Sequence, residues 1–233
     1  EGKLFFGHLD VMLNIRNQNT ISDLIPHATN LDEGLVREIV AEHATGIEVL
    51  LAPSSLQIAQ GIRPEDMYNV FMNLNRLFDY IIIDAGSALN ENTVTLLDVA
   101  DRTLIVTNPD LAALHDISRF IQLTWTLSYS PDKVLIVLNR AGIPGGIRPA
   151  DVSTALRQNV FAQIPDEGPN GLRSINSGEP LISRYPRSAA AKAFQNLAKE
   201  LLKLSATTAS ARGSTPEGDT SRRDALLASS QYG

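Results

Sequence analysis

Polar residues that could do chemistry stand directly after short apolar runs. Asp84 follows the most apolar run, Tyr80-Ile81-Ile82-Ile83, and Asn139 ends another, residues 133–139. A carboxylate at the end of a strand can hold Mg²⁺ through water beside a nucleotide phosphate, or it can cap a helix or bond to a loop. The Asn139 amide both donates and accepts hydrogen bonds, which suits a purine edge; a turn residue is the alternative interpretation.

Two further runs end in proline and aspartate. In Asn108-Pro109-Asp110, the proline imposes an extended turn and Asp110 is placed to cap the next helix. Pro165-Asp166 follows the run at 160–164 in the same way. In an open α/β sheet ligands bind beyond the carboxyl ends of the strands, so these positions are candidate site residues.

The elements that must position these residues alternate between short apolar runs and longer amphipathic stretches. Most runs are apolar at consecutive positions, which is typical of strands buried on both faces of a parallel sheet. We therefore predict an α/β fold, with a doubly wound, mostly parallel sheet and helices on both faces. The predicted strands are residues 4–7, 46–52, 79–84, 102–107, 133–139 and 160–164, and the clearest helices are 64–77, 114–127, 150–157 and 188–204.

The composition excludes several classes of protein. The 233 residues are 43% hydrophobic, so the chain can build a core, and a net charge of −6 argues against coating nucleic acid by bulk charge. The absence of cysteine removes disulfides, thiolate metal sites and cysteine nucleophiles. No apolar run is long enough to cross a bilayer, and a cytoplasmic location is expected.

Two segments differ in composition. Residues 1–204 carry the alternating pattern of one domain, whereas residues 205–233 are rich in Ser, Thr, Ala and Gly and are expected to form a disordered tail. The chain starts with Glu rather than Met, so we expect the numbering to begin inside a longer product.

Motifs that the sequence lacks narrow the chemistry. No segment matches G-x-x-x-x-G-K-[ST], the loop that cradles nucleotide phosphates, and there is no G-x-S-x-G or H-E-x-x-H. The glycine-rich stretch 142–146 has no Lys-Ser/Thr pair and is interpreted as a connection.

Several segments in a fixed order nevertheless resemble one family. They are FGHLDVMLNI, FDYIIIDAGSALNENTVTLLDVADRTLIVTNPDLAAL, KVLIVLNRAG and INSGEPLISRYPRSAAAKAF. Together they resemble the MinD/ParA family of deviant-Walker ATPases over residues 1–204, and within it the CpaE/TadZ branch that localises the assembly of Flp-type pili.

The resemblance implies a dimer that binds ATP and Mg²⁺ at its interface. By position, Asp84 matches the Walker B aspartate that holds Mg²⁺. Asn139 matches the residue that reads the adenine edge, with Arg140 after it, and Pro165 and Asp166 match the loop that closes over the base. The first strand and the phosphate-binding loop would precede Glu1.

One departure bears on catalysis. The family usually has an Asp-x-Asp pair where this chain reads Glu1-Gly2-Lys3, so Lys3 replaces the carboxylate that positions water. Lysine accepts no hydrogen bonds and so has no equivalent role. Whether the chain is an ATPase therefore stays open, and no residue is assigned as catalytic. An upstream receiver-like domain is a further feature of the pilus branch.

These features lead to two hypotheses. The first is an ATP-dependent dimer that positions pilus or secretion machinery at the inner membrane through partner proteins, without inserting into the membrane. The second is a non-hydrolysing scaffold that keeps the fold and the partner surface. A DNA-segregating relative is disfavoured, because the chain is acidic and its carboxyl half has no Lys/Arg cluster.

Overall fold

The computed structural model describes residues 1–211, and the predicted tail beyond them, 212–233, lies outside the described residues. The chain forms two compact units. The first contains residues 1–101 and 171–184, and the second contains residues 102–170 and, of the described residues, 185–211. The predicted site residues are divided between the units, so each unit is described by itself.

The second unit is built on a parallel sheet. Its strands are β3 (Thr103–Thr107), β4 (Val134–Ala141) and β5 (Val160–Pro165), in the order β3-β4-β5. The register pairs Thr103 with Val134 and Ile136 with Val160. Three of the predicted strands and the parallel arrangement are thereby confirmed.

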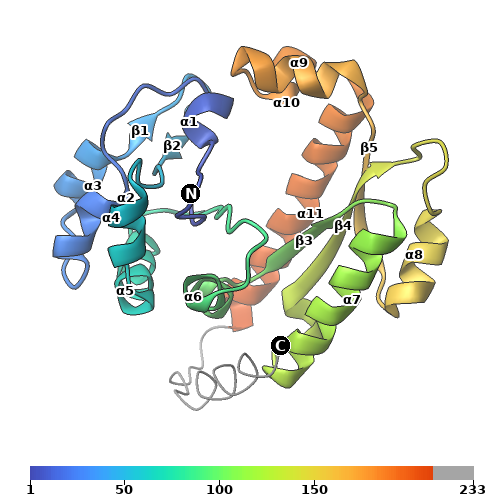
Figure 1. Cartoon of the computed structure of the whole chain (residues 1–233), viewed down its shortest axis with the longest axis horizontal. Coiled ribbons are helices and arrows are strands. Elements are labelled where there is room, and N and C mark those ends of the chain that lie inside the picture. Colours follow the sequence, from blue (N-terminus) through green and yellow to red (C-terminus); the bar gives the residue numbers. More distant parts are fainter. Residues whose placement is uncertain (212–233) are drawn as a thin grey trace. The chain divides into compact units, whose positions relative to one another are not determined.

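Helices cover both faces of this sheet (Figure 1). α7 (Leu111–Thr126) and α8 (Pro149–Leu156) pack on one face, where the core residues include Ile121, Ile136 and Leu138. α11 (Ala189–Ala211) lies on the other face, against β5. The short helix η2 (Pro131–Lys133) precedes β4. After β5 the chain enters α9 (Pro169–Ser177), most of which belongs to the first unit. This arrangement confirms the predicted α/β class.

Local sequence explains where these helices begin. Asp110 caps α7 as predicted, because its Oδ1 accepts a hydrogen bond from the Ala113 N–H at 2.9 Å. Pro149 opens α8 at the first helical position, where its missing N–H costs nothing. At the other end of the chain α11 continues to Ala211, beyond the helix end expected at 204. Alanine is frequent in 205–211, and its high helix propensity favours this extension.

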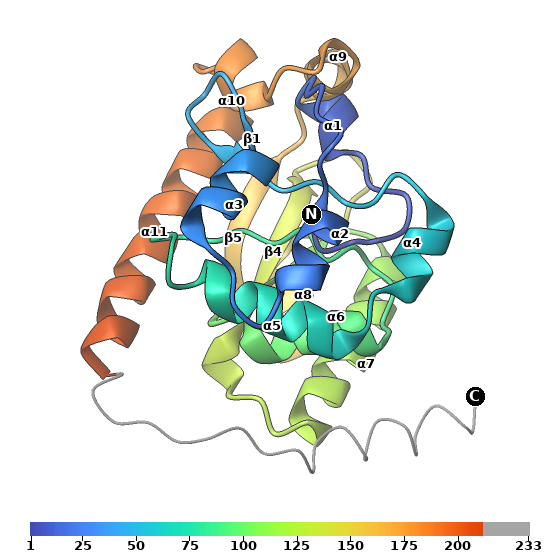
Figure 2. The same ribbon diagram turned by 90° about the vertical axis from the view of Figure 1, so that its left-hand side faces the viewer.

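The first unit is mainly helical (Figure 2). Its best-packed pair is α5 (Pro64–Leu74) with α6 (Glu91–Val99), which lie side by side. The core of the unit includes Ile21, Val36, Met67 and Val70. The remaining helices are α1 (Leu9–Met12), α2 (Ile21–Leu24), η1 (Ile25–His27), α3 (Glu33–Ile39), α4 (Leu56–Gly61) and α10 (Leu181–Arg184). Within the described residues, no helix has the length and apolar character to span a membrane.

Three predicted strands of this unit are not formed as expected. Residues 4–7 and 79–84 form no strand, and of 46–52 only β2 (Glu48–Val49) is a strand. β2 pairs in an antiparallel sense with β1 (Ala41–Glu42). The predictions for these segments were wrong because a strand needs a continuous ladder of hydrogen bonds to a neighbour as well as an apolar sequence.

The segment 79–84 still alternates between two sides. Ile81 and Ile83 pack against the core, whereas Tyr80 is 62% exposed and Ile82 is 94% exposed. This period of two is that of an extended chain with one face packed. The sequence predicted burial of both faces, and the structure buries one.

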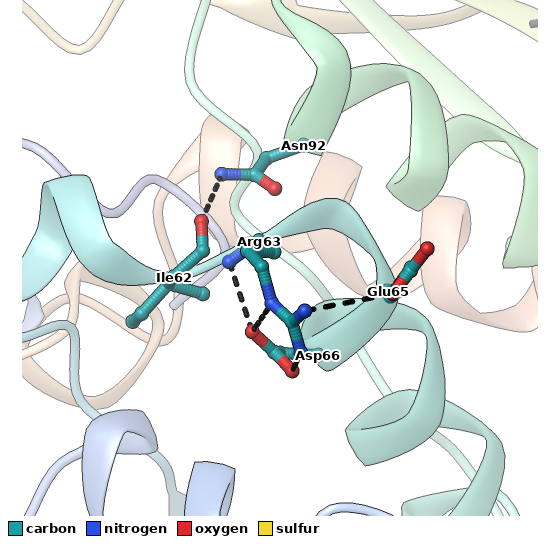
Figure 3. Close-up of polar contacts among 5 residues, drawn as sticks. All are labelled: Ile62, Arg63, Glu65, Asp66 and Asn92. Carbon is teal, nitrogen blue, oxygen red and sulfur yellow. Dashed lines mark hydrogen bonds and ion pairs between the residues drawn. The ribbon is translucent and has the colours of Figure 1, made fainter.

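The start of α5 is fixed by a charged pair (Figure 3). The Asp66 carboxylate accepts hydrogen bonds from the Arg63 backbone N–H at 3.1 Å and from its guanidinium at 2.9 and 3.0 Å. These bonds lower the pKa of Asp66, whose side chain is only 12% exposed. Asn92 of α6 donates to the Ile62 carbonyl at 3.3 Å, which ties α6 to the same turn.

Candidate nucleotide site

Asp84 lies at the end of the extended segment, beside the first residues of the chain. Its backbone carbonyl accepts hydrogen bonds from the N–H groups of Gly2 and Lys3, both at 2.8 Å. Its Oδ1 accepts from the Gly86 N–H at 3.0 Å, which is the loop contact that the sequence left open as an alternative. One carboxylate oxygen is therefore used by the local turn.

The side chain of Lys3 packs against Gly86. The φ of Gly86 is +68°, and a Cβ added there would lie 3.0 Å from Cγ and 3.1 Å from Cδ of Lys3. Glycine is the residue that adopts this backbone region without strain. The aliphatic stem of Lys3 thus packs on the turn that follows Asp84, and the structure brings Lys3 and Asp84 together.

The other residues of the Glu1-Gly2-Lys3 segment are also tightly held. The Glu1 carboxylate accepts a hydrogen bond from the His8 N–H at 2.7 Å. A Cβ on Gly2 would stand 2.6 Å from side-chain carbons of both Ile83 and Leu96, so no larger residue fits without movement. The segment is part of the packed first unit.

In the second unit, Asn139 and Arg140 lie near the carboxyl end of β4. Asn139 is inside the strand, so the turn interpretation of this residue is wrong. The ladder with β5 is irregular between Leu138 and Ala141, and Arg140 has φ +53° within that irregularity. A bulge of this kind re-aims side chains and is frequent beside functional sites.

The end of β5 meets the end of β4. Pro165 is the register partner of Ala141, and Asp166 Oδ1 accepts a hydrogen bond from Arg140 Nε at 2.8 Å. The Arg140 side chain is 52% exposed and that of Asp166 is 30% exposed. The structure therefore brings Arg140, Pro165 and Asp166 together at the carboxyl edge of the sheet, the edge at which such folds bind ligands.

An open cavity of about 220 Å³ adjoins Arg140. The turn 108–110 and the glycine-rich stretch line it, and the Ile147 N–H donates to the Pro109 carbonyl at 2.9 Å. The stretch 142–146 thus forms one side of the cavity, and the hydrogen bond that follows it holds it to the turn after β3. The residues that line the cavity are Asn108, Pro109, Asp110, Arg140, Ile143, Pro144, Gly145 and Gly146.

The carboxylate of Asp84 is the candidate ligand for a metal ion. Within residues 1–211 no group of three His, Cys, Asp or Glu side chains is placed to hold a metal. Mg²⁺ commonly takes one or two carboxylates and completes its shell with water and substrate phosphates, so the single carboxylate of Asp84 is compatible with it. When bound, Mg²⁺ would neutralise phosphate charge beside Asp84.

Comparisons with known proteins agree with this fold. No protein-family model matches the chain. It is 29% identical to the septum site-determining protein MinD of Thermotoga maritima over 202 residues, which are 83% of this chain and 72% of that protein. It is 25% identical to an uncharacterized ATP-binding protein of Methanocaldococcus jannaschii, over 83% of this chain and 75% of that protein.

Solved structures of ParA and MinD proteins have the same fold. A ParA family ATPase from Chlorobium tepidum superimposes with a TM-score of 0.79 at 23% identity, covering 84% of this chain and 82% of that one. MinD of Pyrococcus horikoshii, solved as a complex with Mg-ADP, gives a TM-score of 0.74 at 22% identity, covering 88% and 82%.

The chain has the α/β fold of the ParA and MinD structures, and its sequence is similar to those of MinD proteins. At the level of individual proteins, it is similar in sequence to MinD of Thermotoga maritima over 83% of its length.

Sequence reasoning missed two residues that shape the site. Gly86 supports Lys3, and Glu167 contacts the start of α11, where its Oε1 accepts from the Ala190 N–H at 2.7 Å. The first could have been noticed as a glycine directly after a strand-end aspartate. The second had no local signal, because its partner is distant in sequence.

Proposed function

We propose that this protein is an ATP- and Mg²⁺-binding localisation factor of the MinD/ParA type that acts as a nucleotide-dependent dimer. By the family resemblance, the second unit would contact the base through Asn139, Arg140, Pro165 and Asp166, and Asp84 of the first unit would hold Mg²⁺ through water. The phosphates of ATP would need a glycine loop of the G-x-x-x-x-G-K-[ST] type, which the 233 residues do not contain. The proposed partners are pilus or secretion assembly proteins at the inner membrane.

The observation that supports this proposal most is the junction of β4 and β5. Two parallel strands end together with Asn139 and Arg140 on one and Pro165 and Asp166 on the other, and the Arg140–Asp166 ion pair joins them. Polar groups that converge at the carboxyl edge of a parallel sheet are the usual setting of a nucleotide. The similarity to ATP-binding relatives is independent support.

A second candidate function is a non-hydrolysing scaffold. Lys3 supports it, because the residue that stands beside Asp84 is a cation and offers no acceptor to an attacking water. Asp84 and Asn139 are retained in either case, so a scaffold of this kind would bind nucleotide without turning it over.

Calorimetric titration with Mg·ATP tests both functions. The chain as given is expected to bind only weakly, since it has no phosphate loop, and neutral hydrogen bonds to the base contribute only about 0.5–1.5 kcal/mol each. A version extended upstream is expected to bind in the micromolar range and to dimerise on binding. Absence of binding by the extended version would overturn the proposal.

Phosphate release measured on the same extended protein separates the two candidates. Turnover at a rate above that of the buffer favours the ATPase, whereas binding and dimerisation without turnover favour the scaffold.

A further inference from the structure

The loop that follows β5 is anchored on its first side to β4. Asp166 uses both carboxylate oxygens: Oδ1 accepts from Arg140 Nε at 2.8 Å, and Oδ2 accepts from the Gly168 N–H at 3.2 Å. Gly168 has φ +50°, so the loop turns sharply at this point. These contacts connect the loop to the strand that carries Asn139.

The same loop is anchored on its second side to α11. Glu167 Oε1 accepts from the Ala190 N–H at 2.7 Å. The next free amide, Ala191 N–H, is capped locally by Ser188 Oγ at 3.1 Å. The first N–H groups of a helix have no partner inside the helix, and a carboxylate there also interacts favourably with the helix dipole. Because Ala190 and Ala191 are buried, water is a poor substitute for these acceptors.

We propose that Glu167 is a positioning residue that fastens the loop 165–168 to α11, so that the base side of the site is formed before a nucleotide arrives. This inference rests on the proposed function. Asp166 and Glu167 are successive residues of one loop, and two different elements hold them: Arg140 of β4 and the Ala190 N–H of α11. Such a two-point anchor restricts the loop more than either contact alone.

The backbone of Arg140 fits this interpretation. Its positive φ is unfavourable for a residue with a side chain and persists where surrounding contacts impose it. The ion pair to Asp166 is such a contact, and Arg140 lies within the register shift between β4 and β5. A loop held in advance spares the ligand the entropic cost of ordering it, which increases affinity.

Hydrogen exchange on the ligand-free chain of 233 residues tests the anchor directly. Glu167→Ala removes the acceptor, and the Ala190 amide and the loop amides at 166–168 are expected to exchange roughly fivefold faster, the factor expected for loss of a helix cap. Glu167→Gln keeps a side-chain carbonyl and is expected to restore slow exchange, and Glu167→Asp should lie between the two.

Glu200→Ala is the matched control. Glu200 is on the same helix and pairs with Lys203 at 2.6 Å on the exposed surface, so its loss should not change exchange at 166–168. Wild-type exchange at Ala190 and the loop in Glu167→Ala would overturn the proposal. Uniformly faster exchange throughout the second unit would also overturn it, because Glu167 would then support general stability.

Nucleotide affinity provides the functional measurement. In the version extended upstream, Glu167→Ala is expected to weaken Mg·ATP binding about fivefold or more, with affinity regained in Glu167→Gln. If the wild-type protein binds no nucleotide, the proposed function fails while the exchange experiment still decides the anchor. If the wild type binds and Glu167→Ala binds equally well, the positioning role fails and the function stands.

Discussion

The backbone N–H of Lys3 donates a hydrogen bond to the backbone carbonyl of Asp84 at 2.8 Å. A cation and a carboxylate that are distant in sequence therefore stand on adjacent chain segments, and the stem of Lys3 rests on Gly86. This relationship determines three of the predictions.

Replacing Lys3 with aspartate should create a second carboxylate beside Asp84. Two like charges in this position repel, so the free energy of unfolding should fall in metal-free buffer and recover on addition of Mg²⁺. Denaturant unfolding with and without Mg²⁺ measures this difference, and Lys3→Ala is the control that removes the cation without adding an anion. Equal responses of the two variants to Mg²⁺ would contradict the prediction. In the version extended upstream, Lys3→Asp should also raise ATP turnover.

Asp84→Asn should weaken Mg·ATP binding and leave the fold intact. The asparagine carbonyl still accepts from the Gly86 N–H, so the turn is kept, but the charge that attracts Mg²⁺ is lost. Titration of the extended protein measures the affinity, and circular dichroism checks the fold. Wild-type affinity for Mg·ATP would reduce Asp84 to a residue of the turn.

Gly86→Ala should destabilise the first unit by about 1–2 kcal/mol, since a side chain is strained at positive φ. The new methyl group would also press on the Lys3 stem, so the double variant with Lys3→Ala should recover the steric part and retain the strain. Urea unfolding measures both. Gly61→Ala is a matched control, because Gly61 lies in α4 with open space around it and should be neutral or slightly stabilising.

Stability should depend on the ionisation of Asp66. Its hydrogen bonds to Arg63 depress its pKa below the ordinary value of 3.8, so the native state binds this proton less readily than the unfolded state. The stabilisation is therefore fully present above about pH 4 and is lost as the pH falls through the lower native pKa. Unfolding curves recorded across this range should show a loss that is absent in Asp66→Asn.

The Arg148–Asp151 pair is the natural comparison for Asp66. It has the same spacing at the start of α8, and hydrogen bonds to Arg148 likewise lower the pKa of Asp151, but the Asp151 side chain is 49% exposed. Solvent screens an exposed pair, so Asp151→Asn should change the acid dependence less. An equal or larger effect at Asp151 would show that burial is not what strengthens the Asp66 contact.

The sequence alone determined the elements whose signals are local. The apolar runs that became β3, β4 and β5, the cap at Asp110 and the helix start at Pro149 were predictable, because each depends on a few neighbouring residues. The same reasoning placed Asp166 and Arg140 at strand ends. The parallel order then made their proximity an expectation of the fold.

Tertiary structure decided what depends on distant partners. Residues 79–84 had the strongest strand signal, yet they form no strand among the described residues, because a ladder needs a neighbour that composition does not reveal. Lys3 beside Asp84, and Glu167 at the start of α11, are contacts between segments whose separation in sequence carries no pattern. Hydrophobic periodicity specifies which face of an element is buried, and only packing specifies which polar groups then meet.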